Sequence, residues 1–174
     1  MKEISFKFKI LYILGSFIFL TSCGGWQLRG KDALYGQNIM AYIDGDRNTS
    51  LGNALRTAFR ERGVTVVSNS GNAEILVDIL RSDFRRRVVS LDPQTGRVRE
   101  LEIQLLSEVV IRSRTYGLLM PRQVMRLQRD YFFDELAAEF TTNRGQVIES
   151  DLAKDWAFSV VYRALASLKK NNKP

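Results

Sequence analysis

Apolar and polar residues alternate most regularly between residues 98 and 114. One set is apolar and the other polar: Leu101, Ile103, Leu105, Val109 and Ile111 alternate with Glu100, Glu102, Gln104, Glu108 and Arg112. Successive side chains of a strand point to opposite faces, so the pattern predicts a strand with one buried and one hydrated face. Residues 73–91 form the expected partner strand of a long hairpin, because the turn-forming sequence Asp92-Pro93-Gln94-Thr95-Gly96 joins the two segments.

Helical spacing of apolar residues marks two further segments. The first begins after Ser50, which can cap a helix, and Gly63 is a natural stop; its apolar face holds Leu51, Ala54, Leu55, Ala58 and Phe59. The second follows a polar loop over 141–145 and predicts a final helix over about 147–168. Its apolar residues recur every four positions: Ile148, Leu152, Trp156, Val160, Ala164 and Leu168.

The remaining apolar runs predict strands. Residues 39–43 and 64–67 are short, and residues 118–133 are longer but are interrupted by Pro121, which favours an edge strand or a bulge. The most economical fold is an α+β two-layer sandwich. We expect a four-stranded mixed sheet with two helices on one face, in the order strand, helix, three strands, helix.

The N-terminus has the layout of an export signal. A basic start is followed by a short apolar run and by Leu20-Thr21-Ser22-Cys23, which resembles the bacterial lipobox. We therefore expect residues 1–22 to be removed and Cys23 to carry lipid; an ordinary secretory signal that ends near a cysteine is the alternative. Residue 24 is Gly rather than Asp, which by resemblance to lipoprotein sorting implies the outer membrane.

The rest of the chain divides by composition. Residues 23–38 are rich in glycine and predict a lipidated tether, residues 39–168 predict a single domain, and residues 169–174 predict a frayed basic tail.

Composition limits the chemistry. The chain has no His and one Cys, which excludes His-based nucleophilic triads and most zinc sites, so we expect no metal and no cofactor. Glu100 and Glu102 share a strand face and leave carboxylate catalysis formally open, but alternating polar residues on a hydrated face explain them too. We expect no enzyme. The net charge of +7 would favour nucleic acid in a cytosolic protein, whereas for an exported one it indicates phosphorylated lipids or sugars.

Arginines gather in two places. Arg85-Arg86-Arg87 precedes the hairpin turn, and Arg97 and Arg99 follow it, so the group is either a docking site for a phosphorylated ligand or a solvated strand end. The second group, on the strand over 118–133, includes Arg122 and Arg126.

That strand ends in three consecutive aromatic residues. At least one of Tyr131, Phe132 and Phe133 must face away from the helices, because neighbouring side chains alternate. Arg122, Arg126, Tyr131 and Phe132 are the candidate partner interface; a hydrated strand face wrapped by the following loop is the alternative.

Taken together, these segments resemble the LptE family of LPS-assembly lipoproteins. The resemblance covers the opening Cys23-Gly24-Gly25-Trp26-Gln27-Leu28-Arg29, with one extra Gly, and continues through Leu55-Arg56 and Gly63-Val64. It extends through the hairpin turn and Tyr131-Phe132-Phe133-Asp134 to the closing helix.

The resemblance implies a small sandwich inside the lumen of the outer-membrane β-barrel LptD, on its periplasmic side. Such a plug supports barrel assembly, helps transfer lipopolysaccharide to the outer leaflet and binds that lipid itself. The corresponding candidates here are Arg97 and Arg144, with Arg87 and Arg99 as neighbours. The alternatives are a structural lipoprotein of another envelope complex, without lipopolysaccharide contact, and a carboxylate-dependent hydrolase.

Overall fold

A computed structural model describes residues 38–45, 49–133 and 138–172; for residues 138–142 it describes the backbone only. The expected signal peptide, Cys23 and most of the tether lie outside this range. The elements follow in this order: β1 (Met40–Asp44), α2 (Ser50–Glu61), β2 (Thr65–Val66), a 3-10 turn (Ser70–Asn72), β3 (Ile75–Leu91), β4 (Val98–Ser113), β5 (Gly117–Phe132) and α3 (Ala138–Asn171).

In the part of the chain that the structure describes, these strands form one five-stranded mixed sheet in the order β2-β1-β3-β4-β5. β1 runs parallel to β2 and β3, whereas β3, β4 and β5 are antiparallel. The α+β sandwich is confirmed, and the expected count of four strands was one short. The five segments predicted as strands all join the sheet; the one predicted over 64–67 is the two-residue β2, which is held by the pairing of Met40 with Thr65 and of Ala41 with Val66.

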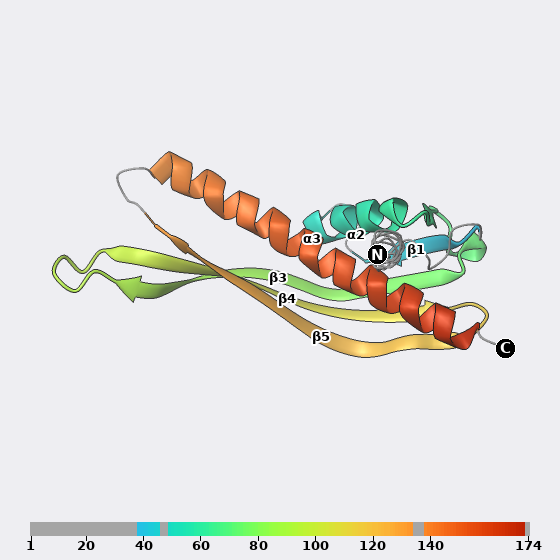
Figure 1. The fold of residues 1–174 in the computed structure, drawn as a ribbon. Helices are drawn as coiled ribbons and strands as arrows, with labels where there is room; N and C mark the ends of the chain where they lie inside the picture. The colour runs from blue at the N-terminus through green and yellow to red at the C-terminus, as the bar shows by residue number, and fades with distance from the viewer. Residues whose placement is uncertain (1–37, 46–48, 134–137, 173–174) are drawn as a thin grey trace, which may run out of the picture. The chain divides into compact units, whose positions relative to one another are not determined.

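Both described helices lie on one face of the sheet (Figure 1). The core between the layers takes the alternate residues of β4 that the sequence predicted, such as Ile103, Leu105 and Ile111, all fully buried. The predicted stripe of the last helix is buried as well: Ile148, Leu152, Trp156, Val160, Ala164 and Leu168. The opposite face of the sheet carries no helix among the described residues.

Three expected helix boundaries were wrong. Thr49, rather than Ser50, caps α2, its hydroxyl accepting from the Gly52 N–H at 3.4 Å. α3 already begins at Ala138, so the expected loop over 141–145 lies inside the helix. It also continues to Asn171, through the first half of the expected tail. Gly145 made this segment look like a loop, because glycine destabilises a helix by roughly 1 kcal/mol relative to Ala. In the structure Gly145 is buried, where the helix passes close to the sheet.

The hairpin of β3 and β4 is longer than the region that α2 and β1 cover (Figure 1). Ile75, Val77 and Ile79 at the start of β3 are buried, whereas Val88 and Leu91 at its end are exposed. The far end of the hairpin therefore projects from the core at the end of the sheet where α3 begins.

Candidate functional site

The hairpin turn is fixed by its own aspartate. The Asp92 carboxylate accepts the N–H groups of Gln94 at 3.0 Å and Thr95 at 2.9 Å, and the Thr95 hydroxyl at 3.0 Å. These hydrogen bonds hold the pKa of Asp92 below its usual range. Gly96 adopts φ +68°, which favours glycine. The one acid of the turn, Asp92, is therefore engaged within the turn.

Large apolar side chains are exposed around this tip. Val88 is 50% exposed, Val89 46% and Leu91 56%, while Phe132, at the end of β5, is 68% exposed. A β-bulge lies between Val88 and Ser90, so the regular alternation of faces breaks there. The sequence signal was the consecutive pair Val88-Val89, which cannot be buried on one face of a regular strand.

Arginines flank the same apolar surface. Arg97 closes the turn through its carbonyl, which accepts the Asp92 N–H at 2.7 Å, and the Arg99 carbonyl accepts the Phe133 N–H at 2.8 Å. Both side chains are exposed. Apolar surface next to guanidinium groups suits a ligand that has both acyl chains and phosphates.

Arg144 is exposed, but it belongs to the early part of α3 rather than to a loop before it. The start of α3 lies at the same end of the sheet as the hairpin tip (Figure 1). The structure therefore brings the candidates Arg97, Arg99 and Arg144 to one end of the sandwich.

The fourth candidate, Arg87, is held by a partner within the sheet. It lies opposite Glu102 and donates from Nε at 2.5 Å and from Nη2 at 3.2 Å to the two carboxylate oxygens. These bonds keep the pKa of Glu102 below its usual range and raise that of Arg87. Glu102 was expected on a hydrated face, yet it is only 2% exposed, because Arg87 covers it.

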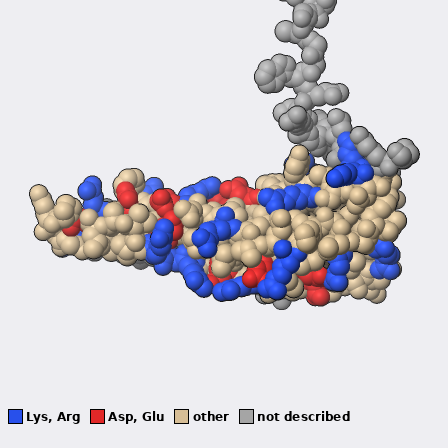
Figure 2. Space-filling model, turned by 90° about the horizontal axis from the view of Figure 1, so that it is seen from below, with Lys and Arg blue, Asp and Glu red and all other residues tan. Residues whose placement is uncertain are grey.

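The same arrangement recurs along the open face of the sheet. Further arginines lie beside carboxylates in the pairs Arg85–Asp83, Arg112–Asp78 and Arg122–Glu108. Figure 2, which views the molecule from the side opposite to the helices, shows the basic and acidic side chains interleaved. This face therefore carries many charges, but each of these arginines lies beside a carboxylate. Such a face is suited to contact with water rather than to binding nucleic acid.

The candidate interface on β5 is divided between the two faces. Arg122, Arg126 and Phe132 are exposed, as an interface requires. Tyr131 is 8% exposed, packs in the core and contacts the helix layer, so its assignment to an exposed interface was wrong. The expectation that one aromatic faces away from the helices is confirmed by Phe132.

Ion pairs connect α3 to the projecting half of the sheet. Arg86 of β3 donates to Glu149 at 2.8 Å, and Arg129 of β5 donates to Asp155 at 3.0 Å. One turn before Glu149, the backbone of α3 passes close to side chains of the sheet: a Cβ added to Gly145 would lie 3.4 Å from the Arg86 guanidinium and from the Tyr131 hydroxyl. These contacts could not be inferred from local sequence patterns, because they join residues far apart in the chain.

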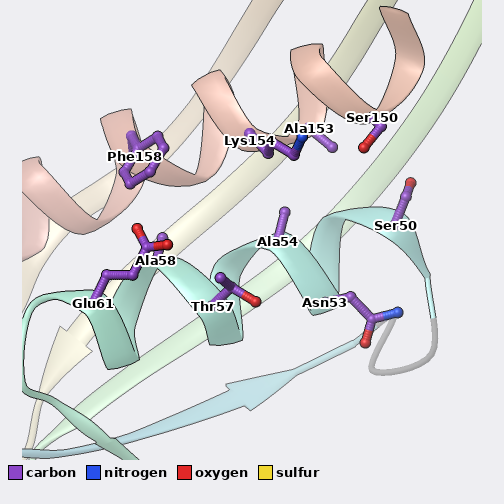
Figure 3. Close-up of a pocket in the computed structure, with 10 residues that line it drawn as sticks. All are labelled: Ser50, Asn53, Ala54, Thr57, Ala58, Glu61, Ser150, Ala153, Lys154 and Phe158. Atoms are coloured by element: carbon purple, nitrogen blue, oxygen red, sulfur yellow. The ribbon is translucent and has the colours of Figure 1, made fainter. Parts of the chain in front are cut away.

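A shallow groove of about 320 Å³ separates α2 from α3 (Figure 3). Its walls are mostly small side chains, including Ala54 and Thr57 from α2 and Ser150 and Ala153 from α3. Phe158 lies at one end. Glu61 and Lys154 also line the groove, which lies away from the hairpin tip.

Among the described residues, no group of acidic or cysteine side chains is placed to hold a metal ion. The same part of the chain contains no helix that is both long and apolar enough to cross a membrane.

The fold is shared with solved structures of bacterial lipoproteins. Rare lipoprotein B from Shewanella oneidensis matches with a TM-score of 0.63 and 19% identity, covering 77% of this chain and 98% of that one. Lipoprotein B from Nitrosomonas europaea gives 0.65 and 21%, covering 85% and 94%. A minor lipoprotein from Acinetobacter baumannii gives 0.59 and 16%, covering 75% and 92%. At these identities the likeness establishes the fold: this chain is a small α+β sandwich of the type found in those lipoproteins.

A sequence-family comparison gives the assignment. The LptE model, described as lipopolysaccharide-assembly, matches residues 40–164. This range includes most of the chain, which therefore belongs to the LptE family. A comparison with curated protein sequences gives no match.

Proposed function

We propose that this protein is a lipid-anchored outer-membrane subunit that binds lipopolysaccharide with the tip of the β3–β4 hairpin. The supporting observation is the exposed apolar group Val88, Val89 and Leu91 beside Arg97 and Arg99. Lipopolysaccharide carries acyl chains and phosphates together. Acyl chains gain from contact with apolar side chains, and phosphates accept paired hydrogen bonds from guanidinium groups.

We assign the phosphate contacts to Arg97 and Arg99, with Arg144 as a further contact at the same end. Arg87 has a different role in this proposal. Its hydrogen bonds to Glu102 keep a buried carboxylate paired, so its contribution is to the structure of the hairpin.

The partner that we propose is an LptD-like β-barrel, whose lumen this domain enters from the periplasmic side. The charged but neutralised open face of the sheet suits the hydrated interior of a wide barrel. In this proposal, the exposed residues Arg122, Arg126 and Phe132 of β5 contact the wall. Anchoring depends on lipid at Cys23, for which mass spectrometry of the mature chain is the direct test.

The lipid-binding proposal is tested with the double variant Arg97→Glu and Arg99→Glu. Reversing both charges is expected to weaken lipopolysaccharide binding at least about tenfold, equivalent to ~1.4 kcal/mol, while leaving the circular dichroism spectrum unchanged. The double variant Lys169→Glu and Lys170→Glu is the matched control, because it makes the same charge change in the last turn of α3, at the opposite end of the helix. Equal binding by the two double variants would contradict the assignment.

Purification from gently solubilised outer membranes tests the barrel partner. Recovery in equal amounts with one large β-barrel protein supports the proposal. Recovery with other envelope proteins, without the barrel, favours instead a structural lipoprotein of a different complex. Neither role requires catalysis, and we propose none for Glu100 or Glu102. Glu100→Gln is expected to leave function unchanged, whereas Glu102→Gln should act only through the stability of the hairpin.

A further inference from the structure

The outer edge of β5 is open along most of its length. Within the described residues the sheet ends at β5, and no strand pairs with the side of β5 that faces away from β4. β5 has 16 residues, whereas β2, the strand at the opposite edge of the sheet, has two. A long open edge carries unpaired backbone groups to which another strand can add.

One backbone hydrogen bond identifies the groups that point outward. The Phe133 N–H donates to the Arg99 carbonyl, so residue 133 bonds toward β4. Residues of an antiparallel pair alternate between bonding toward their partner and pointing away from it, and the β4–β5 register is regular from Gln123 to Phe132. The residues that direct their N–H and C=O groups to the open edge are therefore Val124, Arg126, Gln128, Asp130 and Phe132.

The side chains of these five residues lie on one face of the sheet, and their chemical types are arranged symmetrically about the central residue. Gln128 lies at the centre, flanked by Arg126 on one side and Asp130 on the other. Val124 and Phe132 stand at the two ends and are 64% and 68% exposed. Along the strand the side chains are therefore apolar, positive, amide, negative and apolar. When a second copy of the strand runs antiparallel to the first, each positive side chain faces a negative one and each apolar side chain faces an apolar one.

We propose that a second copy of this chain pairs with this edge, the two β5 strands running antiparallel with Gln128 opposite its own equivalent. In this register Arg126 of each copy faces Asp130 of the other, and Val124 faces Phe132. Each facing pair exchanges two backbone hydrogen bonds, as directly opposed residues do in antiparallel sheets. Opposite charges and apolar side chains in direct opposition each stabilise a cross-strand pair.

Other registers lose this complementarity. Moving one strand by two residues in either direction places Arg126 opposite Gln128 or Phe132, and a further shift places it opposite another Arg126. Charges on an edge strand usually discourage pairing, because like charges meet like. Here Arg126 and Asp130 lie at equal distances on either side of Gln128, so in one register opposite charges face each other and favour pairing.

This pairing is independent of the proposed function. It concerns the chain when β5 is not covered by another protein, and it shields the exposed edge from unspecific strand addition. In the proposed barrel complex the same strand faces the wall, so the barrel and the second copy would compete for it.

The test uses cysteine cross-linking of the full chain purified away from other envelope proteins, so that no other protein covers β5. Gln128→Cys places two thiols across the proposed two-fold axis, where opposed Cα atoms lie about 5.5 Å apart, within the range of a disulfide. Oxidation is expected to give a covalent dimer of this variant. Arg126→Cys is the matched control, because its equivalents are displaced along the strands and should not join. The unaltered chain, with Cys23 alone, controls for the native cysteine.

Charge exchange tests the register further. In the Gln128→Cys background, Arg126→Asp is expected to lower the dimer yield severalfold, since Asp then faces Asp130, and adding Asp130→Arg is expected to restore it. All three positions are exposed, so folding is not at risk. Equal yields from Gln128→Cys and Arg126→Cys, or no dimer, would each overturn the proposal. A failed lipopolysaccharide-binding or barrel test would leave it standing.

Discussion

Arg87 lies directly across the strands from Glu102 and covers its carboxylate with two hydrogen bonds, leaving Glu102 2% exposed on a face without a helix. This pair of side chains joins β3 to β4 at the point where the projecting half of the hairpin begins. It therefore links the stability of the sheet to the charge of one carboxylate.

Glu102→Gln is expected to destabilise the domain at neutral pH and to flatten the dependence of its stability on acid. The pKa of Glu102 is held below its ordinary value of 4.5, so the charged form is stabilised in the folded chain. Its contribution is complete above the ordinary pKa and is lost as the pH falls through the lowered value. Urea unfolding between about pH 3 and pH 7 measures this. Glu100→Gln is the control on the same strand and should keep the acid dependence.

Gly145→Ala is expected to stabilise the domain by about 0.5–1 kcal/mol, because alanine is the better helix former and the added methyl group reaches only ordinary contact distance. Gly145→Leu should destabilise it, since a longer side chain must displace Arg86 or Tyr131. The midpoints of chemical denaturation decide both. A loss of stability in the alanine variant would show that α3 lies closer to the sheet than described.

Trp156 is fully buried, and its Nε1–H has no hydrogen-bond partner among the described residues. Trp156→Ala is expected to cost about 3–5 kcal/mol through the cavity that it leaves. Trp156→Phe should cost less than half as much, because it fills part of the space and removes a donor whose burial without a partner costs about 1–3 kcal/mol. Comparable losses in the two variants, measured by thermal unfolding, would mean that the indole N–H is bonded in solution.

The ion pair between Arg86 and Glu149 is expected to contribute little. Their side chains are 45% and 28% exposed, and partly exposed pairs of this kind contribute about 0.2–1 kcal/mol. A double-mutant cycle with both residues changed to Ala gives the coupling energy directly. It should decrease when salt is raised to about 1 M, where charges are screened within about 3 Å. A coupling of several kcal/mol would indicate that the pair is desolvated.

Local patterns predicted the elements well where one face is buried. The alternation around Ile103 and Leu105 identified both faces of β4, and the four-residue spacing from Ile148 to Leu168 identified the buried stripe of α3. Local patterns were wrong where a distant contact decides, as at Gly145, which is accommodated within α3 because the helix passes close to β3 and β5.

The candidate site shows the same division. Arg97 and Arg99 were found because they flank a recognisable turn. The burial of Glu102 and the pairing of Arg87 depend on the β3–β4 register, and the burial of Tyr131 depends on which face of β5 meets α3; neither is written in the local sequence. The exposed Val88 and Leu91 could be interpreted only once the hairpin was seen to project from the core.

Photo-cross-linking in living cells tests the central claim most directly. A photoreactive amino acid replaces Leu91 at the hairpin tip or, as the matched control, Leu118, which is 59% exposed at the other end of the sheet. After irradiation, the chain altered at Leu91 is expected to carry covalently attached lipopolysaccharide and the chain altered at Leu118 much less. Lipopolysaccharide attached equally at both positions, or at Leu118 alone, would contradict binding at the tip.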